Sequence, residues 1–161
     1  MLNLSEQDFV LEVKNLKKSY GPLEVLKDVS FSARAGSVTS FIGSSGSGKS
    51  TLLRCCNLLE ISQQGDIIFK GNPVNWINKG TDRQPADKDQ IIAIRTHLSM
   101  VFQSFNLWSH LTVLDNLIEA PVTVLGKNRD EMKQLGQTLL EKVGIADKAN
   151  AWPAQLSGGQ Q

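Results

Sequence analysis

The feature that most constrains this chain is the run GSSGSGKS, from Gly43 to Ser50. It fits the pattern G-x-x-x-x-G-K-[ST] and stands between VTSFIG (38–43), expected to form a short buried strand, and Ser50–Leu59, expected to form a helix. Glycines let the backbone wrap so that successive N–H groups cradle an anion, and the helix that follows adds its positive end. The pattern therefore predicts a phosphate-binding loop rather than a merely flexible Gly/Ser segment.

The motif assigns a role to each side chain at its end. Lys49 is expected to reach the β- and γ-phosphates, the Ser50 hydroxyl to bind Mg²⁺, and Thr51 to contact the α-phosphate. The expected nucleotide-binding residues of the loop are Gly43, Ser44, Ser45, Gly46, Ser47, Gly48, Lys49, Ser50 and Thr51. Small-molecule kinases, GTPases and transport ATPases all contain such a loop, so the loop alone does not identify the function.

Length and charge bound the class of protein. A chain of 161 residues is one domain or most of one, and a net charge of +1 offers no global field for a nucleic-acid partner. No apolar run reaches the 18 residues that a membrane-spanning helix needs. The start, MLNLSEQDFVLEV, carries Glu6 and Asp8 and lacks the basic and apolar regions of a secretory signal, so the cytosol is the expected compartment.

Cys55 and Cys56 are the only cysteines and are adjacent in the chain. Neighbouring cysteines rarely pair with each other, and two thiols do not make a zinc site. We therefore expect both to be buried, reduced thiols.

The first part of the chain reads mainly as strands. Apolar residues alternate with period 2 in FVLEVKNL (9–16) and again in 29–33, and Gly65 precedes the strand-like DIIFK. The predicted helix Ser50–Leu59 places four apolar side chains on one face: Leu52, Leu53, Cys56 and Leu59. The polar stretch from Asn75 to Lys88 is expected to be a loop or insertion.

The second part reads mainly as helices. A short helix is expected over Gln90–Thr96 and a strand over HLSMVFQ (97–103). Thr112 is a good N-cap for a helix over Val113–Leu125, which Pro121 should bend or end. A further helix is expected over Asp130–Val143, stopped near Gly144. Strands that lead and helices that follow indicate an α/β domain with a helical second half.

Three further motifs carry a resemblance to a known family. LSGGQ lies near the end of the chain, VFQ ends at Gln103, and KKSYG contains Tyr20. With the phosphate loop, these motifs resemble those of ABC transporter ATP-binding subunits: the signature, the Q-loop, and an aromatic residue that stacks on adenine. The signature residues so implied are Leu156, Ser157, Gly158, Gly159 and Gln160.

A narrower resemblance covers most of the chain. The segments RCCNLLE (54–60), ADKDQ (86–90), 95–126 and LLEKVGI (139–145) resemble the ATPases of polar amino-acid importers, such as the histidine and basic amino-acid permeases of bacteria. Two departures stand out: Ile61-Ser62 replaces the usual Glu-Pro, and Ser104 replaces a common His. Neither position contacts the phosphates in the family.

The resemblance implies a fold and a domain organisation. The fold is α/β: a P-loop NTPase core with N-terminal antiparallel strands and a helical subdomain, with the C-terminal part of the central sheet missing. Residues 1–161 then form an incomplete nucleotide-binding domain. Residues 1–95 hold the strand-rich part and the phosphate loop, and residues 96–161 hold the Q-loop and the helical subdomain up to the signature.

The resemblance also implies partners. Two such subunits pack head to tail, and ATP lies between the phosphate loop of one and the signature of the other, where Ser157 and the N–H groups of Gly158 and Gly159 contact the γ-phosphate. Gln103 senses Mg²⁺ or the attacking water, and the segment 104–110 contacts membrane-spanning permease subunits. The chain would thus sit peripherally on the cytoplasmic face of the bacterial inner membrane.

The sequence does not decide the role of two aromatic side chains near the Q-loop, and it assigns no chemical role to two histidines there. Phe105 and Trp108 suit either an interface with the permease or the domain's own core. His97 and His110 have no carboxylate or nucleophile placed beside them, so we expect both to be non-catalytic.

In this family, the general base and the switch histidine follow the signature, so the resemblance places both beyond Gln161, and no earlier segment substitutes for them. The full-length form is expected to hydrolyse ATP and drive transport. The alternative is a truncated, non-hydrolysing nucleotide-binding fragment without a transport role. A P-loop kinase of small molecules, the third reading, gives no reason for LSGGQ. Loss of the strand that follows the signature is also expected to expose the backbone edge of 38–43.

Overall fold

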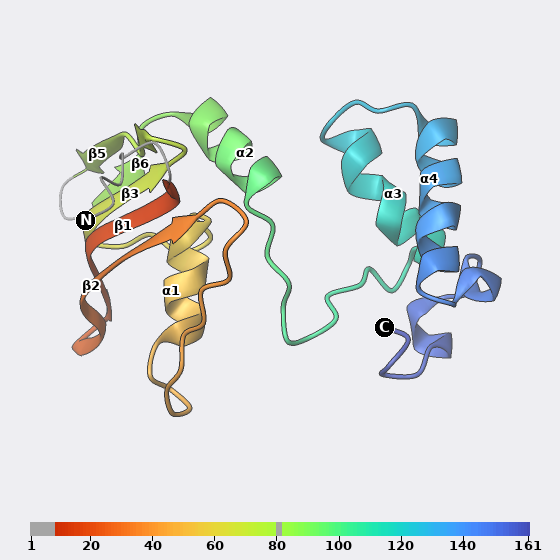
Figure 1. Ribbon diagram of the computed structural model, residues 1–161, viewed down its shortest axis with the longest axis horizontal. Coiled ribbons are helices and arrows are strands. Elements are labelled where there is room, and N and C mark those ends of the chain that lie inside the picture. The colour runs from red at the N-terminus through yellow and green to blue at the C-terminus, as the bar shows by residue number, and fades with distance from the viewer. Residues whose placement is uncertain (1–8, 80–81) are drawn as a thin grey trace. The chain divides into compact units, whose positions relative to one another are not determined.

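The computed structural model describes residues 9–79 and 82–161, which form two compact units (Figure 1). The first unit ends at Val101 and the second begins at Phe102. The sequence predicts a division near residue 95. Glu6 and Asp8, which argue against a secretory signal, lie outside the described residues.

The first unit is built on an antiparallel sheet with the strand order β2-β1-β3-β4. The strands are β1 (Phe9–Tyr20), β2 (Leu23–Arg34), β3 (Gln64–Phe69) and β4 (Asn72–Pro73). β1 and β2 form a long hairpin, and β3 pairs with the other edge of β1. The period-2 segments 9–16 and 29–33 lie in β1 and β2, and the segment after Gly65 lies in β3, so these three strand predictions are confirmed.

A second, two-stranded sheet occupies the segment predicted to be a loop. β5 (Trp76–Lys79) and β6 (Asp82–Pro85) pair antiparallel. The Arg83 guanidinium lies 3.9 Å from the centroid of the Trp76 ring and donates a hydrogen bond of 2.7 Å to the Gly65 carbonyl. The loop prediction was wrong because these strands are held by backbone pairing and by a cation–π contact, neither of which requires an apolar repeat.

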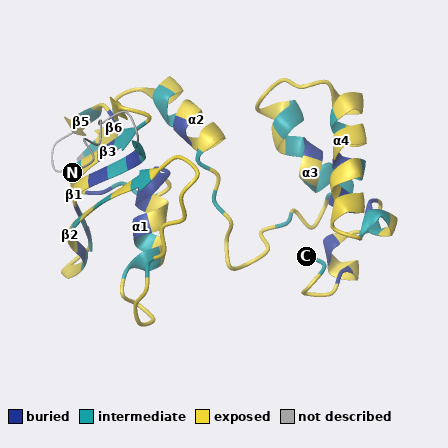
Figure 2. Ribbon diagram, in the orientation of Figure 1, coloured by how far each residue is buried: buried dark blue, intermediate teal, exposed yellow. Residues whose placement is uncertain are grey.

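The core of the first unit lies between the sheet and α1 (Lys49–Cys56). Leu52, Cys55 and Cys56 on α1 are buried, together with residues of the sheet that include Val13, Leu16 and Ile67 (Figure 2). Two members of the predicted apolar face are instead about half exposed, Leu53 at 46% and Leu59 at 45%. The helix ends at Cys56 and Leu58 has a positive φ of 62°, so the chain leaves the helical path before Leu59.

The helix α2 (Lys88–His97) confirms the predicted short helix and extends it at both ends. The Asp87 carboxylate caps it by accepting hydrogen bonds from the backbone N–H groups of Asp89 and Gln90. Ile94 is its buried anchor in the core. His97, expected to open a strand, is instead the last residue of this helix.

Two predicted strands, 38–43 and 97–103, were wrong: neither segment forms a strand. Three of their apolar side chains lie in solvent, with exposed fractions of 92% for Val38, 97% for Ile42 and 96% for Val101, whereas Phe41 and Leu98 are partly buried against the core. A strand is stable only when a neighbouring strand satisfies its backbone groups. Within the described residues, the four-stranded sheet ends at β2 and β4, and neither segment is paired with it.

The second unit consists of helices. It contains α3 (Val113–Thr123), α4 (Arg129–Lys142) and two short 3₁₀ helices, η2 (Ala146–Lys148) and η3 (Pro153–Gln155). Gly136 of α4 lies close to α3, since a Cβ at this position would come within 2.7 Å of Leu114. The buried core residues of the cluster around these elements are Val113, Leu140, Ala149 and Leu156. The two predicted helices are confirmed, and α3 ends two residues after Pro121.

None of the helices among the described residues is both long enough and apolar enough to cross a membrane.

Candidate phosphate-binding site

The phosphate-binding motif forms a glycine-rich loop that opens α1. The N–H of Ser47 donates to the Ser44 carbonyl at 3.3 Å, which closes a tight turn inside the loop. Gly46 and Gly48 have φ values of 78° and 92°, in the region that favours glycine. The motif's glycines are therefore required by the backbone path at these two positions.

Gly48 also allows the loop to approach β2 closely. A Cβ at Gly48 would lie 3.1 Å from the Val25 carbonyl oxygen and 3.1 Å from side-chain carbons of Val25 and Leu26. The loop thus rests on the start of β2, and together they enclose a hollow of about 230 Å³. The residues lining the hollow are Val25, Gly46, Ser47, Gly48, Lys49, Ser50 and Thr51.

Lys49 supplies the positive charge of the hollow. Its ammonium group donates to the carbonyls of Gly43 and Ser44 at 2.8 and 2.7 Å, and to the Ser47 hydroxyl at 3.2 Å. These contacts hold the ammonium group of Lys49 against the loop. A phosphate in the hollow would meet the charged donor of Lys49 beside the loop.

The backbone at the start of α1 adds to the positive field. The first N–H groups of a helix have no intrahelical acceptor and carry partial positive charge. The first turn of α1 contains no acidic residue that would compete for these groups. The hollow therefore combines a cation, free helix N–H groups and glycines, a combination suited to a polyphosphate.

Tyr20 ends β1 at the hairpin that leads into β2. It pairs with Leu23, two residues before Val25, which borders the hollow. Its side chain is 44% exposed, so part of the ring is available to a ligand. The ammonium group of Lys18 lies 4.8 Å from the centroid of the ring. The structure therefore places the predicted adenine-stacking residue and the phosphate loop in the same unit.

The signature segment lies in the second unit as a turn following η3. Leu156 is buried in the core, which anchors the segment. The Ser157 carbonyl accepts from the N–H groups of Gln160 and Gln161, and the Gln160 side-chain oxygen accepts from the Ser157 N–H at 3.0 Å. A Cβ at Gly159 would meet no atom within 4 Å, so its backbone is open to a ligand.

Gln103 and the segment that follows it have no regular secondary structure, and Gln103 is exposed. Phe105 and Trp108, which the sequence left open between a core and an interface, are 52% and 49% exposed. Trp108 stacks on His110 with 6.4 Å between ring centroids. The end of this segment is nevertheless held firmly by α3.

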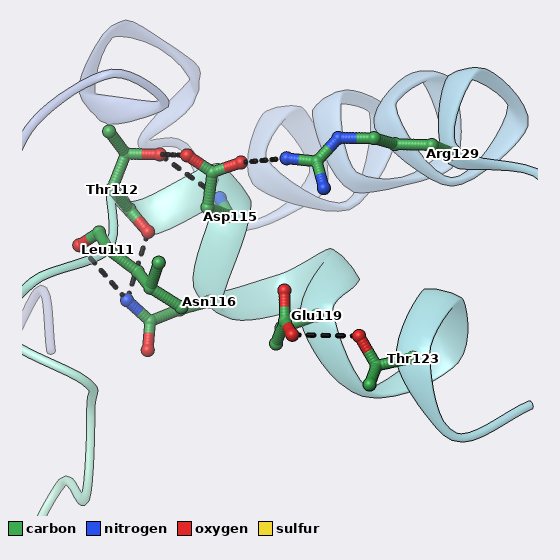
Figure 3. A network of polar contacts seen from close by, with 7 residues as sticks. All are labelled: Leu111, Thr112, Asp115, Asn116, Glu119, Thr123 and Arg129. Carbon is green, nitrogen blue, oxygen red and sulfur yellow. Dashed lines mark hydrogen bonds and ion pairs between the residues drawn. The ribbon is translucent and has the colours of Figure 1, made fainter.

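Asn116 of α3 is the side chain that holds it. Its amide nitrogen donates to the carbonyls of Trp108, Leu111 and Thr112 at 3.1, 3.2 and 2.9 Å, and its oxygen accepts from the Trp108 N–H at 2.8 Å. The Leu111 and Thr112 bonds appear in Figure 3. The segment 108–112 is therefore fixed to the start of α3.

A second set of polar contacts fixes the start of α3 itself (Figure 3). The Thr112 hydroxyl accepts from the Asp115 N–H and donates to the Asp115 carboxylate. Arg129, at the start of α4, donates to the same carboxylate at 2.9 Å. This ion pair links the first turns of the two helices.

Sequence reasoning missed several residues of these sites. Val25 borders the phosphate hollow and belongs to no motif, and Lys18 lies against Tyr20 within KKSYG, where only Tyr20 was assigned a role. Asn116 could have been suspected, because an amide four residues after a helix N-cap can reach back to the preceding carbonyls. Nothing in the local sequence around Val25 or Lys18 indicates their contacts, since these arise from pairing between distant segments.

The chain belongs to the ABC transporter family, whose pattern matches residues 26–161. The match begins in β2 and includes the phosphate loop, Gln103 and the signature segment. The resemblance to ABC transporter ATP-binding subunits is therefore confirmed, and the structure is that of a mixed α/β P-loop domain.

Characterised relatives are similar over nearly the whole chain. It is 52% identical over 153 residues to the histidine/lysine/arginine/ornithine transport ATP-binding protein HisP of Escherichia coli, covering 94% of this chain and 60% of HisP. It is 51% identical over 155 residues to the arginine/ornithine transport ATP-binding protein AotP of Pseudomonas aeruginosa. This match covers 95% of this chain and 61% of AotP. The chain thus spans about 60% of the length of these relatives.

Solved structures share the fold. A superposition on cbiO1 from Clostridium perfringens, part of the ABC transporter complex cbiONQ, has a TM-score of 0.74 at 26% identity, covering 95% of this chain and 57% of cbiO1. A superposition on the ATP-binding cassette MJ0796, solved as a dimer bound to ADP and Pi, has a TM-score of 0.73 at 31% identity. It covers 93% of this chain and 64% of MJ0796.

Proposed function

We propose that this chain is the ATP-binding part of the energy-coupling subunit of an ABC importer for polar, basic amino acids. The observation that carries the proposal is the hollow over the loop, where Lys49, Gly48 and the start of α1 present a cation and backbone donors to a polyphosphate. Membership of the family and the names of the relatives HisP and AotP support the transported class.

The loop residues would hold the phosphates of ATP. Residues 43–48 offer backbone N–H groups, Lys49 offers its ammonium group, and Thr51 offers a hydroxyl near the α-phosphate. Tyr20 would stack on the adenine ring with the exposed part of its own ring. Gly48 suits the phosphate loop, because its φ of 92° favours glycine and a Cβ there would lie only 3.1 Å from Val25 and Leu26.

Mg²⁺ would neutralise charge on the β- and γ-phosphate oxygens. The oxygen donors assigned to it are the Ser50 hydroxyl and the side-chain carbonyl of Gln103, which are ligand types that Mg²⁺ prefers. Ser50 is exposed on the first turn of α1, and Gln103 is exposed in its segment, so both donors are accessible.

The signature segment would act in a head-to-tail dimer. Leu156 anchors the turn, and Ser157, Gly158, Gly159 and Gln160 would present a hydroxyl and backbone donors to the γ-phosphate of the ATP held by the partner subunit. Binding of ATP would then favour closure of the pair, because the ligand contacts both subunits only in the closed state.

The segment from Ser104 to His110 would contact the membrane-spanning permease subunits, and the protein would then lie peripherally at the cytoplasmic face of the inner membrane. Half-exposed Phe105 and Trp108 suit such a contact, and Asn116 would keep the end of the segment rigid. ATP hydrolysis belongs to this proposal for the full-length protein. No observation on residues 9–79 and 82–161 favours the alternative of a non-hydrolysing fragment without a transport role.

ATP binding by the purified protein at its natural length tests the proposal. Lys49→Met is expected to weaken Mg·ATP binding at least tenfold in a calorimetric titration, because the variant removes the cation that faces the phosphates. Lys27→Met, at an exposed position on β2, serves as the control and should bind like the wild type.

Equal affinities of the wild type and Lys49→Met would refute the phosphate site. The transported class is tested separately by the uptake of labelled arginine and histidine into cells with and without the gene. Unchanged uptake would refute the basic amino-acid assignment without affecting the phosphate site.

A further inference from the structure

Lys18 is an unusual lysine because its charged end is buried. It lies on β1 two residues before Tyr20, and its side chain is only 10% exposed. Buried lysines are rare unless their ammonium group is fully paired. The burial of the Lys18 ammonium group therefore indicates a role other than keeping the surface soluble.

Three groups surround the ammonium nitrogen of Lys18. The Glu60 carboxylate lies 3.1 Å away, the Ile61 carbonyl accepts a hydrogen bond of 2.8 Å, and the centroid of the Tyr20 ring lies 4.8 Å away. An ammonium group has three N–H donors. The carboxylate, the carbonyl and the face of the ring thus account for all three.

The same region of β1 is clamped by the segment that follows α1. The Gln63 N–H donates to the Lys17 carbonyl at 3.0 Å, and the Gln63 side chain both accepts from the Ser19 N–H and donates to the Ser19 carbonyl. The Glu60 N–H donates to the Arg54 carbonyl in α1. The helix that begins at the phosphate loop is therefore linked through Glu60 and Lys18 to the ring of Tyr20.

We propose that Lys18 is a positioning residue for nucleotide binding: its ammonium group, fixed by Glu60 and Ile61, holds the Tyr20 ring in the orientation in which it stacks on the base. The inference rests on the proposed function, because Tyr20 has a base to stack on only if the chain binds ATP. Lys18 itself is not among the residues that line the hollow beside Lys49, so it is not expected to contact the phosphates. Its effect should therefore depend on the presence of the base.

The test compares two ligands that share phosphates and differ in the base, ATP and inorganic tripolyphosphate, both with Mg²⁺. Lys18→Met keeps the apolar stem and removes the charge. It is expected to weaken ATP binding about threefold to tenfold, the range of a partly desolvated cation–π contact, and to change tripolyphosphate binding less than twofold. Lys27→Met, on the exposed part of the neighbouring strand, is the matched control and should change neither.

A double-variant comparison separates positioning from a general effect on folding. Tyr20→Ala should weaken ATP binding at least as much as Lys18→Met. In the Tyr20→Ala background, Lys18→Met should add less than a twofold effect, because the ring through which it acts is gone. Loss of both ATP and tripolyphosphate binding in Lys18→Met would show a structural role only and overturn the proposal.

The remaining outcomes distinguish this inference from the proposed function. If Tyr20→Ala weakens ATP binding and Lys18→Met does not, the positioning role is wrong and the ATP site stands. If Lys49→Met binds ATP like the wild type, the proposed function itself is wrong. If Lys18→Met does not fold, Glu60→Gln is tested in its place. Glu60→Gln is expected to lower the affinity for ATP twofold to threefold and to leave the affinity for tripolyphosphate unchanged. An unchanged ATP affinity would refute the proposal.

Discussion

The thiols of Cys55 and Cys56 are the most strongly perturbed titratable groups in the core. Both are free and buried at the end of α1. Burial raises the pKa of Cys55 to about 11 and that of Cys56 to about 12, from an ordinary value of 9.0, because a thiolate is poorly solvated in the core. Such thiols are inert at neutral pH, which confirms the expectation of buried, reduced cysteines.

These shifts predict how the thiols contribute to stability. The folded-state pKa values lie above the unfolded value, so the unfolded chain loses protons first as the pH rises. The free energy of unfolding should therefore be unaffected by the thiols below about pH 8 and should fall between about pH 9 and pH 12. Urea unfolding followed by circular dichroism at several pH values measures this slope.

The double variant Cys55→Ala/Cys56→Ala is the control for this prediction. It should be less stable overall, because it removes buried volume, and should show a shallower fall above pH 9. The two proteins share all their other side chains, so only the difference between their slopes is informative. Identical slopes would contradict the predicted role of the thiols.

At the scale of single residues, motif positions were predictable and their neighbours were not. Gly46, Gly48 and Lys49 follow from the motif, because tight turns around phosphates need glycine and a cation at set spacings. Val25 contributes through its contact with Gly48 in the loop, and Lys18 through its contacts with the segment after α1. Such contacts depend on strand register, which no local pattern encodes.

At the scale of elements, the pairing of β1 with β3 depends on one glycine. Gly65 has a φ of 92°, and a Cβ there would lie 2.5 Å from the Asn15 carbonyl oxygen and 2.6 Å from the Leu16 Cα. The register of β1 with β3 is irregular at this place, between Lys14 and Lys17. The strands can approach so closely only because position 65 has no side chain.

Gly65→Ala is therefore expected to destabilise the first unit by about 2–4 kcal/mol, from backbone strain and overpacking together. Gly71→Ala is the matched control: its φ is 76° but no atom lies within 4 Å of the added Cβ, so the expected loss is about 1 kcal/mol, from strain alone. Both are measured by urea unfolding in a Trp108→Phe/Trp152→Phe background, where the fluorescence of Trp76 reports on the first unit. Equal losses would show that the close approach of the strands is unimportant.

Most helices could be predicted because their signals are local. Thr112 caps the start of α3, Pro121 lies two residues before its end, and Gly144, with a φ of 77°, follows α4. Caps and breakers act within a few residues of the helix end, so the sequence shows them directly. The hairpin β5–β6 was missed for the opposite reason, since its short strands carry no apolar alternation and pair with each other.

At the scale of the whole chain, two apolar segments predicted to be strands are unpaired. Side chains from both segments, among them Phe41 and Val101, join Leu11 and Phe31 in lining an apolar hollow of about 260 Å³ in the first unit. Ile42 itself is 97% exposed, whereas Ile67 on β3 is fully buried. Apolar sequence therefore contributes to the core only where the tertiary structure covers it.

Two isoleucine variants of this 161-residue chain test that conclusion. Ile67→Ala should lower the free energy of unfolding of the first unit by about 2–5 kcal/mol, because it leaves a cavity between the sheet and α1. Ile42→Ala should change it by less than about 0.5 kcal/mol, because its side chain lies in solvent. The same Trp76 fluorescence measurement applies, and a loss above 1 kcal/mol for Ile42→Ala would show that 38–43 is packed.

The sequence by itself determined the phosphate loop, the caps and ends of the helices, and membership of the ABC transporter family. Each of these depends on residue types at short, fixed spacings, and such spacings act through local backbone geometry. The tertiary structure alone decided which apolar segments became strands, where the ammonium group of Lys18 lies, and which side chains border the hollow beside Lys49. These depend on partners far away in the chain, because a strand or a buried charge is stable only when another segment satisfies its backbone or its charge.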